Sequence, residues 1–288
     1  MSGLPALGLA AGLLAALVFG FAAVLQAHAV RRLGAQPENL VAFLLASARD
    51  PWTLLVVAGY LVGFVLHAVA IWLLPLYLAQ AAIAMSLPVT VIASILLEGG
   101  LRAAHWWAIG VVTLGLVLLA AGSGDAGSVL VTTPFVVALW AGLLLLGVAA
   151  RLGIGLGGAA LGALSGLGYA GSAIAVRGVG TPVEILVVAA ALAVPVYGVL
   201  AFWLYSLGMD RARVSSATTP MIVGSTFVPA GVGLALLGDG VRPGWWAAVV
   251  AGLVLATAGT VVLSRDDVRS RAAAESASGP GPAPRPGP

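Results

Sequence analysis

The chain has 288 residues, of which 61% are hydrophobic and only 8% are charged, and its mean hydropathy is +1.12. Soluble domains carry about 25% charged residues, so this composition excludes a soluble core and indicates a helical membrane protein. The formal charge of +3 comes from arginines near helix ends, which favours a role in membrane orientation over nucleic-acid binding. Because the sequence has no cysteine, disulfides and thiolate metal sites are excluded.

Nine hydrophobic stretches are each long enough to cross a bilayer core of about 30 Å at about 1.5 Å per residue. In chain order they lie at about 5–27, 52–74, 76–97, 104–122, 134–150, 153–176, 182–207, 214–237 and 245–264. The first is expected to be retained, because no basic residue precedes it and Arg31 and Arg32 follow it, the reverse of a secretory signal.

Two segments outside these stretches have their own expected structures. Residues 31–51 contain an apolar run that is too short to span, so we expect it to lie at the membrane interface or to pack as a partial helix. Residues 265–288 are polar and then rich in Pro, Gly and Ala, which predicts a disordered tail.

The arginines predict the orientation. All 13 basic residues are arginine, and with the N-terminus outside, every one except Arg177 and Arg242 lies on the cytoplasmic side. This positive-inside bias makes the C-terminus cytoplasmic. Removing the least certain span, 134–150, would spread the arginines almost evenly over the two sides, which favours nine spans. Exclusive use of arginine and Ala/Gly/Val-rich helices suggest a GC-rich bacterial genome, and hence the inner (plasma) membrane.

An internal repeat relates the two halves of the chain. The segment LLEGGLRAAHWW at 96–107 matches LLGDGVRPGWW at 236–246, which aligns Arg102 with Arg242, and Arg31 aligns with Arg177. Arg102 is expected inside and Arg242 outside, as an inverted repeat requires. The predicted fold is an all-α polytopic membrane protein with nine transmembrane helices, in inverted four-helix repeats joined by a linker helix (4+1+4). Its parts are a first repeat, a linker helix, a second repeat and the tail, at 1–122, 123–152, 153–264 and 265–288.

These repeat endings resemble the drug/metabolite transporter superfamily with its EamA-like repeats. The segment LLGDGVRPGWWAAVVAGLVLATAGTVVL at 236–263 is similar to the ending of that repeat, and residues 96–122 are a looser copy. Pro88 and Pro229, each in mid-helix, fit the helix before that ending. The resemblance implies a secondary transporter that moves a small organic solute by alternating access. Most members have ten helices, and the nine-span layout is similar to the NIPA-type magnesium transporter branch.

Polar residues inside the spans are candidate binding residues, because they are costly in a membrane and often mark substrate pathways. Proline frees a helix carbonyl, so paired proline kinks beside hydroxyls in corresponding helices indicate a central site. Hydrogen bonding between helices is the alternative role of the histidine and glutamine among the candidates. The candidate substrate-binding residues are His67, Gln80, Ser86, Pro88, Thr90, Tyr197, Ser225, Thr226 and Pro229.

The sequence offers little support for chemistry beyond transport. Its acidic residues lie in loops or near helix ends, so we expect no metal centre and no cofactor. No catalytic constellation shares a depth, so we expect no enzyme. The expected partners are a small-molecule substrate and the lipid bilayer but no nucleic acid, and a homodimer is left open. A NIPA-like magnesium or divalent cation transporter and a non-transporting membrane scaffold are the alternatives.

Overall fold

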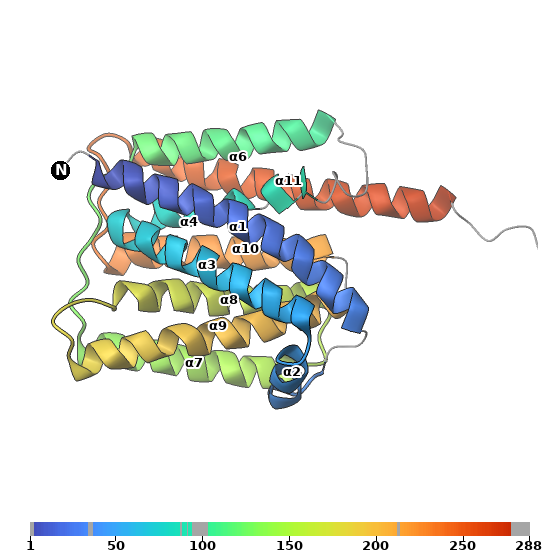
Figure 1. Cartoon of the computed structure of the whole chain (residues 1–288). Coiled ribbons are helices and arrows are strands. Elements are labelled where there is room, and N and C mark those ends of the chain that lie inside the picture. Colours follow the sequence, from blue (N-terminus) through green and yellow to red (C-terminus); the bar gives the residue numbers. More distant parts are fainter. Residues whose placement is uncertain are drawn as a thin grey trace, which may run out of the picture.

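The computed structural model describes residues 3–33, 37–86, 88–90, 92–93, 103–211 and 214–277. Regular structure within these ranges is helical, apart from a single bridge between Ser123 and Val241. The helices, labelled as in Figure 1, are α1 (Leu4–Leu33), α2 (Leu40–Ser47), α3 (Pro51–Leu73), α4 (Leu76–Ala84), α6 (Ala103–Ala121), α7 (Thr133–Gly153), α8 (Gly158–Arg177), α9 (Ile185–Arg211), α10 (Val214–Leu236) and α11 (Trp246–Ala277).

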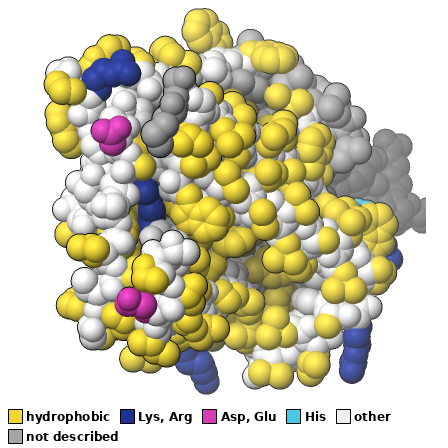
Figure 2. Space-filling model, turned by 60° about the vertical axis from the view of Figure 1, so that its left-hand side comes forward, with side chains coloured by type: hydrophobic (Ala, Val, Ile, Leu, Met, Phe, Trp, Pro, Cys, Tyr) yellow, Lys and Arg dark blue, Asp and Glu magenta, His cyan; other side chains and the backbone are white. Residues whose placement is uncertain are grey.

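Five helices are long and apolar enough to cross a membrane: α1, α3, α7, α8 and α9. Shorter apolar stretches at Leu76–Thr90, Gly110–Ala121, Pro220–Leu236 and Trp246–Gly259 overlap the other predicted spans. Large apolar side chains are exposed on the outside of the bundle, and Figure 2 shows hydrophobic side chains over most of the visible face. The helical fold is therefore confirmed for the described residues, and the five long apolar helices are consistent with a membrane-embedded protein. The number of nine spans stays a prediction, and part of the span at 76–97 lies outside the described residues.

The long helices lie side by side with their axes in roughly one direction (Figure 1). We call one end of the bundle, on the left in Figure 1, the Arg177 end; it holds the α3–α4 turn, the segment 122–132 and the α10–α11 loop. We call the opposite end the α2 end, because it holds the short helix α2 that follows α1. This short helix is the partial helix predicted in residues 31–51.

The helices pack in two related groups. In the first, α1 packs along α3 and α4, and α4 also contacts α6. In the second, α8 packs along α9 and α10, and α10 also contacts α11. The groups meet where α4 packs on α10 and α6 packs on α11, and through smaller contacts of α1 with α9 and of α3 with α8. Helix α7 lies against α8 and α9.

Local sequence explains where several helices begin and end. Helix α3 begins at Pro51 behind Asp50, whose carboxylate accepts hydrogen bonds from the Thr53 hydroxyl and amide at 2.7 and 2.8 Å. The hydroxyl bond is the main cause of a lowered Asp50 pKa. Helix α4 ends at Ala84, because Pro88 has no N–H for that carbonyl and its ring would collide with it. Helix α10 continues through Pro229 without a break.

Helix α11 differs from the expectation for the C-terminal segment. It runs on to Ala277, so the residues 265–277 for which we expected disorder are helical in the structure. Ala, Arg and Glu are frequent toward the end of residues 265–277 and have high helix propensity. The expectation of disorder rested on the Pro/Gly-rich residues that follow and did not weigh this propensity. Residues 278–288 of the predicted tail lie outside the described residues.

Glycines allow α8 and α10 to approach closely. A Cβ atom added to Gly166 would lie 2.5 Å from the carbonyl oxygen of Met221, and one added to Gly162 would overlap the backbone of Ala217. Small residues are the usual means of bringing membrane helices into backbone contact. By contrast, a Cβ atom at Gly198 in α9 would meet nothing within 4 Å.

We therefore expect Gly166→Ala to lower the melting temperature of the detergent-purified protein, because α8 and α10 have to separate, at a cost of about 1–3 kcal/mol. Gly198→Ala is the matched control and is expected to leave the melting temperature unchanged or slightly raised, because alanine favours the helix by about 0.5–1 kcal/mol. Equal melting temperatures for the two variants would show that the α8–α10 contact is not close.

Candidate functional site

His67 of α3 and Gln80 of α4 form a buried pair. The amide Nε2 of Gln80 lies 3.3 Å from Nε2 of His67, and since an amide nitrogen can only donate, the imidazole accepts this bond at Nε2. The ring of Phe19 stands edge-on to the imidazole, with centroids 6.4 Å apart. The Nδ1 atom of His67 is buried and has no hydrogen-bond partner. The pair links two helices, as the alternative role requires, and leaves one polar atom unused in the interior.

The hydroxyls around Pro88 contact backbone. Thr90 is buried, and its hydroxyl lies 2.8 Å from the carbonyl oxygen of Ser86 and 3.2 Å from that of Gly20 in α1. Pro88 is buried and Ser86 is half-buried. A Cβ atom at Gly20 would lie 2.5 Å from Val89, so α1 approaches this segment closely. The chain beyond the break in α4 is thus held against α1.

The corresponding residues of α10 differ from one another. The Ser225 hydroxyl donates to the carbonyl oxygen of Ile222 in the same helix at 3.2 Å. The Thr226 hydroxyl is buried without a hydrogen-bond partner, and Pro229 is also buried. Thr226 is therefore the residue of this helix whose polar group the protein leaves available.

Tyr197 lies in a different part of the molecule from the other candidates. Its hydroxyl donates to the carbonyl oxygen of Leu139 in α7 at 2.7 Å, and its ring packs against Gly171 of α8. It lines a groove of about 920 Å³ whose walls come from α7, α8, α10 and residues 128–132. This groove has mainly apolar walls and does not involve α1, α3 or α4, so Tyr197 is not grouped with His67 and Gln80.

A hydrogen-bond network that we did not predict joins the two groups of helices. Gln26 of α1 donates to the hydroxyl of Ser206 in α9 at 2.9 Å and accepts from the hydroxyl of Tyr60 in α3 at 2.6 Å. Gln26 and Ser206 are almost fully buried. A lone amide in an otherwise apolar first span is the sequence signal that could have identified Gln26.

Aromatic rings surround this network. The Tyr60 ring lies 5.7 Å from that of Phe19 and 5.8 Å from that of Phe202, between centroids. Nearby in sequence, the hydroxyls of Tyr205 and Thr218 lie 2.6 Å apart and connect α9 with α10. At this network the two groups of helices therefore meet through uncharged hydrogen-bonding groups and aromatic rings.

The Arg177 end holds a buried ion pair. Asp239, in the α10–α11 loop, lies 2.8 Å from Arg177 at the end of α8, and their side chains are 0% and 5% exposed. The same carboxylate accepts from the amides of Leu76 at 2.5 Å and Gly127 at 2.9 Å. The arginine also donates to the carbonyl oxygens of Leu74 at 2.9 Å and Gly127 at 3.1 Å.

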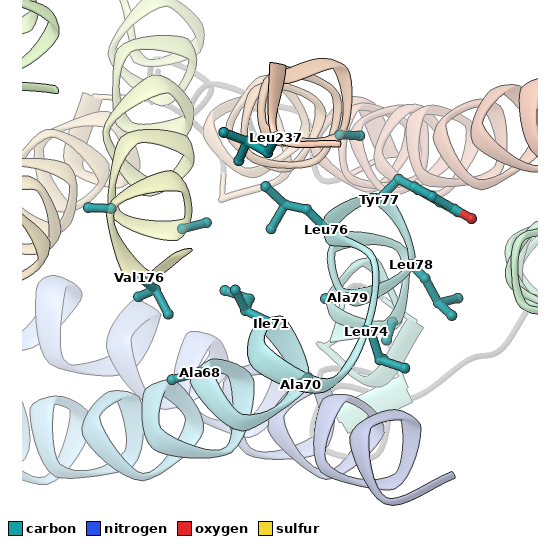
Figure 3. Close-up of a cluster of buried hydrophobic side chains, with 14 of the residues drawn as sticks. Ala68, Ala70, Ile71, Leu74, Leu76, Tyr77, Leu78, Ala79, Val176 and Leu237 are labelled. Carbon is teal, nitrogen blue, oxygen red and sulfur yellow. The ribbon is translucent and has the colours of Figure 1, made fainter. Parts of the chain in front are cut away.

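Further contacts close the same end. The Tyr77 hydroxyl donates to the carbonyl oxygen of Gly240 at 3.1 Å, and the Trp72 indole donates to that of Val176 at 3.2 Å. Apolar side chains from α3, α4, α8 and the α10–α11 loop converge near the same end (Figure 3). In Figure 3 these include Ile71, Leu76, Val176 and Leu237. Sequence reasoning placed Asp239 near a helix end and therefore gave it no role, because chain position alone does not report burial.

Among the described residues, no group of three or more His, Asp or Glu side chains is placed to hold a metal ion. Compared with protein-family models, curated proteins and solved structures, the chain has no match. The arrangement of its own residues is thus the basis for any proposal about what it does.

The contrast between Thr90 and Thr226 generates a prediction about stability. Thr226→Val replaces an unpartnered buried hydroxyl with a methyl group of similar shape, so we expect an unchanged or higher melting temperature. Thr90→Val removes hydrogen bonds to two carbonyls and is expected to destabilise the protein by about 1 kcal/mol. Melting temperatures of the two purified variants test this, and a larger loss for Thr226→Val would mean that its hydroxyl has a partner in the protein.

Proposed function

We propose that the chain is a secondary transporter that moves a small, uncharged organic solute across a membrane by alternating access between two inverted repeats. The observation that carries this proposal is the matched packing of the two groups of helices. Exchanging α1 with α8, α3 with α9, α4 with α10 and α6 with α11 maps most of the observed contacts among these helices onto one another, the contact of α4 with α11 being the exception.

The match extends to the contacts between the groups. The pairing of α1 with α9 becomes that of α8 with α3 under this exchange, and both pairings occur. The pairs α4 with α10 and α6 with α11 map onto themselves, as elements beside a pseudo-two-fold axis should. The same correspondence aligns Arg31 with Arg177 and Arg102 with Arg242 in sequence. Packing and sequence thus support one inverted repeat, with α7 as the linker helix.

The proposed solute site lies between the groups. His67 and Gln80 lie toward the Arg177 end, and Tyr60, Gln26 and Ser206 lie toward the α2 end. Transporters of inverted-repeat design bind their solutes near the repeat interface. Unused polar atoms on His67 and Thr226 favour a solute with hydrogen-bonding groups.

The proposed placement follows the arginines, with the Arg177 end outside and the α2 end cytoplasmic in a bacterial inner membrane. The resemblance of the repeat endings to drug/metabolite transporters supports the same function class.

The test is the melting temperature of the purified protein with a panel of amino acids, nucleosides, lipophilic cations and Mg²⁺. A ligand at about 100 times its dissociation constant stabilises the folded state by about 2.7 kcal/mol, so a bound solute should raise the melting temperature. We expect an organic solute to do so and Thr226→Val to weaken this effect. Ser225→Ala is the matched control, because the Ser225 hydroxyl bonds within its own helix.

Each other outcome of the panel contradicts either the proposed function or the proposed role of Thr226. Stabilisation by Mg²⁺ alone would favour the divalent cation alternative. An unchanged melting temperature with every compound would favour a scaffold. Stabilisation by a solute that Thr226→Val and Ser225→Ala reduce equally would remove Thr226 from the site.

A further inference from the structure

The Arg177–Asp239 pair holds together four segments that meet at one end of the bundle. Asp239 belongs to the α10–α11 loop and Arg177 to the end of α8, both in the second group of helices. Their hydrogen bonds reach the α3–α4 turn of the first group, at Leu74 and Leu76. They also reach Gly127 in the segment that leads into α7. Breaking this pair would therefore weaken the contact between the two groups at this end, leaving the hydrogen bonds of Trp72 and Tyr77 to hold it.

The pair is fitted closely into its surroundings. Added Cβ atoms at Gly127 and Gly233 would overlap the α10–α11 loop, so the absence of side chains there lets this loop approach. Gly238, directly before Asp239, has a φ of 72°, a conformation that favours glycine. Both carboxylate oxygens accept hydrogen bonds, and both terminal nitrogens of the arginine donate them. The loop is thus shaped to bring the carboxylate onto the arginine.

We propose that the Arg177–Asp239 pair is the gate that closes the Arg177 end of the pathway between the two groups, and that the structure shows this gate shut. The inference rests on the proposed transport function for its pathway. The proposed solute site names the residues that bind the solute. The gate names the residues that separate this site from one side of the membrane.

The chemistry of a buried ion pair suits a gate. In the closed state, charges removed from water are stable only when they are paired and hydrogen-bonded. Here both carboxylate oxygens and both terminal nitrogens of the arginine have partners, while the buried Nε of Arg177 has none. In the open state, water can solvate both charges, and an ion pair in water contributes little. The two states are therefore each favourable, and an intermediate with one unpaired buried charge is costly. The apolar side chains that converge near the same end exclude water from the pathway when the pair is formed (Figure 3).

The test uses thiol accessibility, because the chain has no cysteine of its own. Ala79→Cys places a thiol on α4 one turn beyond Leu76, at a residue with 0% exposure. Ser128→Cys places a thiol on the exposed segment before α7 at the same end and serves as the accessible reference. A membrane-impermeant maleimide is applied to intact cells or inverted vesicles, whichever preparation labels Ser128→Cys.

With Asp239 intact, we expect Ala79→Cys to be labelled at least tenfold more slowly than Ser128→Cys. Adding Asp239→Asn should raise the rate for Ala79→Cys to within about threefold of the reference, because the arginine loses its charged partner. Glu184→Gln removes another acid from this end, one that is exposed, and should change nothing. The gate is refuted if Ala79→Cys is labelled equally fast with and without Asp239→Asn, or if Glu184→Gln has the same effect.

Arg177→Lys is the second variant, to be used if the Asp239→Asn protein does not reach the membrane. A lysine keeps the charge but cannot reproduce the planar arrangement that bonds Asp239, Leu74 and Gly127 together, so faster labelling is again expected. Unchanged labelling in a folded Arg177→Lys protein would overturn the gate. The readout needs no transported solute, so faster labelling in a protein that binds nothing in the panel would support the gate and contradict transport.

Discussion

Burial of the Arg177–Asp239 pair is the interaction on which one whole end of the molecule depends. Two opposite charges with side chains 5% and 0% exposed are tolerated only because every segment around them supplies a hydrogen bond or a close backbone approach. Removing one partner from such a pair typically costs about 3–5 kcal/mol, a large fraction of the stability of an ordinary domain. The described ion pair at the α2 end, Arg211 with Glu38, is much more exposed, so the two ends are held in physically different ways.

The class of fold could be read from sequence because membrane insertion imposes a simple pattern. A run of about 20 apolar residues has few alternatives to a spanning helix, so α1, α3, α7, α8 and α9 were all predicted within a few residues. Helix ends were less predictable. Pro88 was expected to kink a helix, and α4 does end at Ala84 before helical backbone resumes at residues 88–90, whereas α10 continues through Pro229. The same residue type gives two outcomes because neighbouring helices decide whether the backbone can compensate for the missing N–H.

The candidate site was predictable only in part, because depth along a helix is readable from sequence and direction around it is not. His67 and Gln80 were chosen for depth and do meet. Tyr197 was chosen in the same way but faces α7 and α8. Gln26 was missed because no partner was predicted for it. Asp239 was missed because it lies at a helix end, where acidic side chains are usually solvated. Contacts between residues more than 100 positions apart, such as Leu74 with Arg177, have no local signal.

Alternating access requires that the two matched groups of helices separate at one end of the bundle while they approach each other at the other end. Pulsed electron–electron distance measurements on spin-labelled protein in lipid test it most directly. One label pair, at Leu7 and Val183, spans the Arg177 end, and another, at Arg49 and Leu156, spans the α2 end, all at exposed residues. We predict that Asp239→Asn lengthens the first distance and shortens the second. Unchanged distances, or changes of the same sign at both ends, would contradict alternating access between these groups.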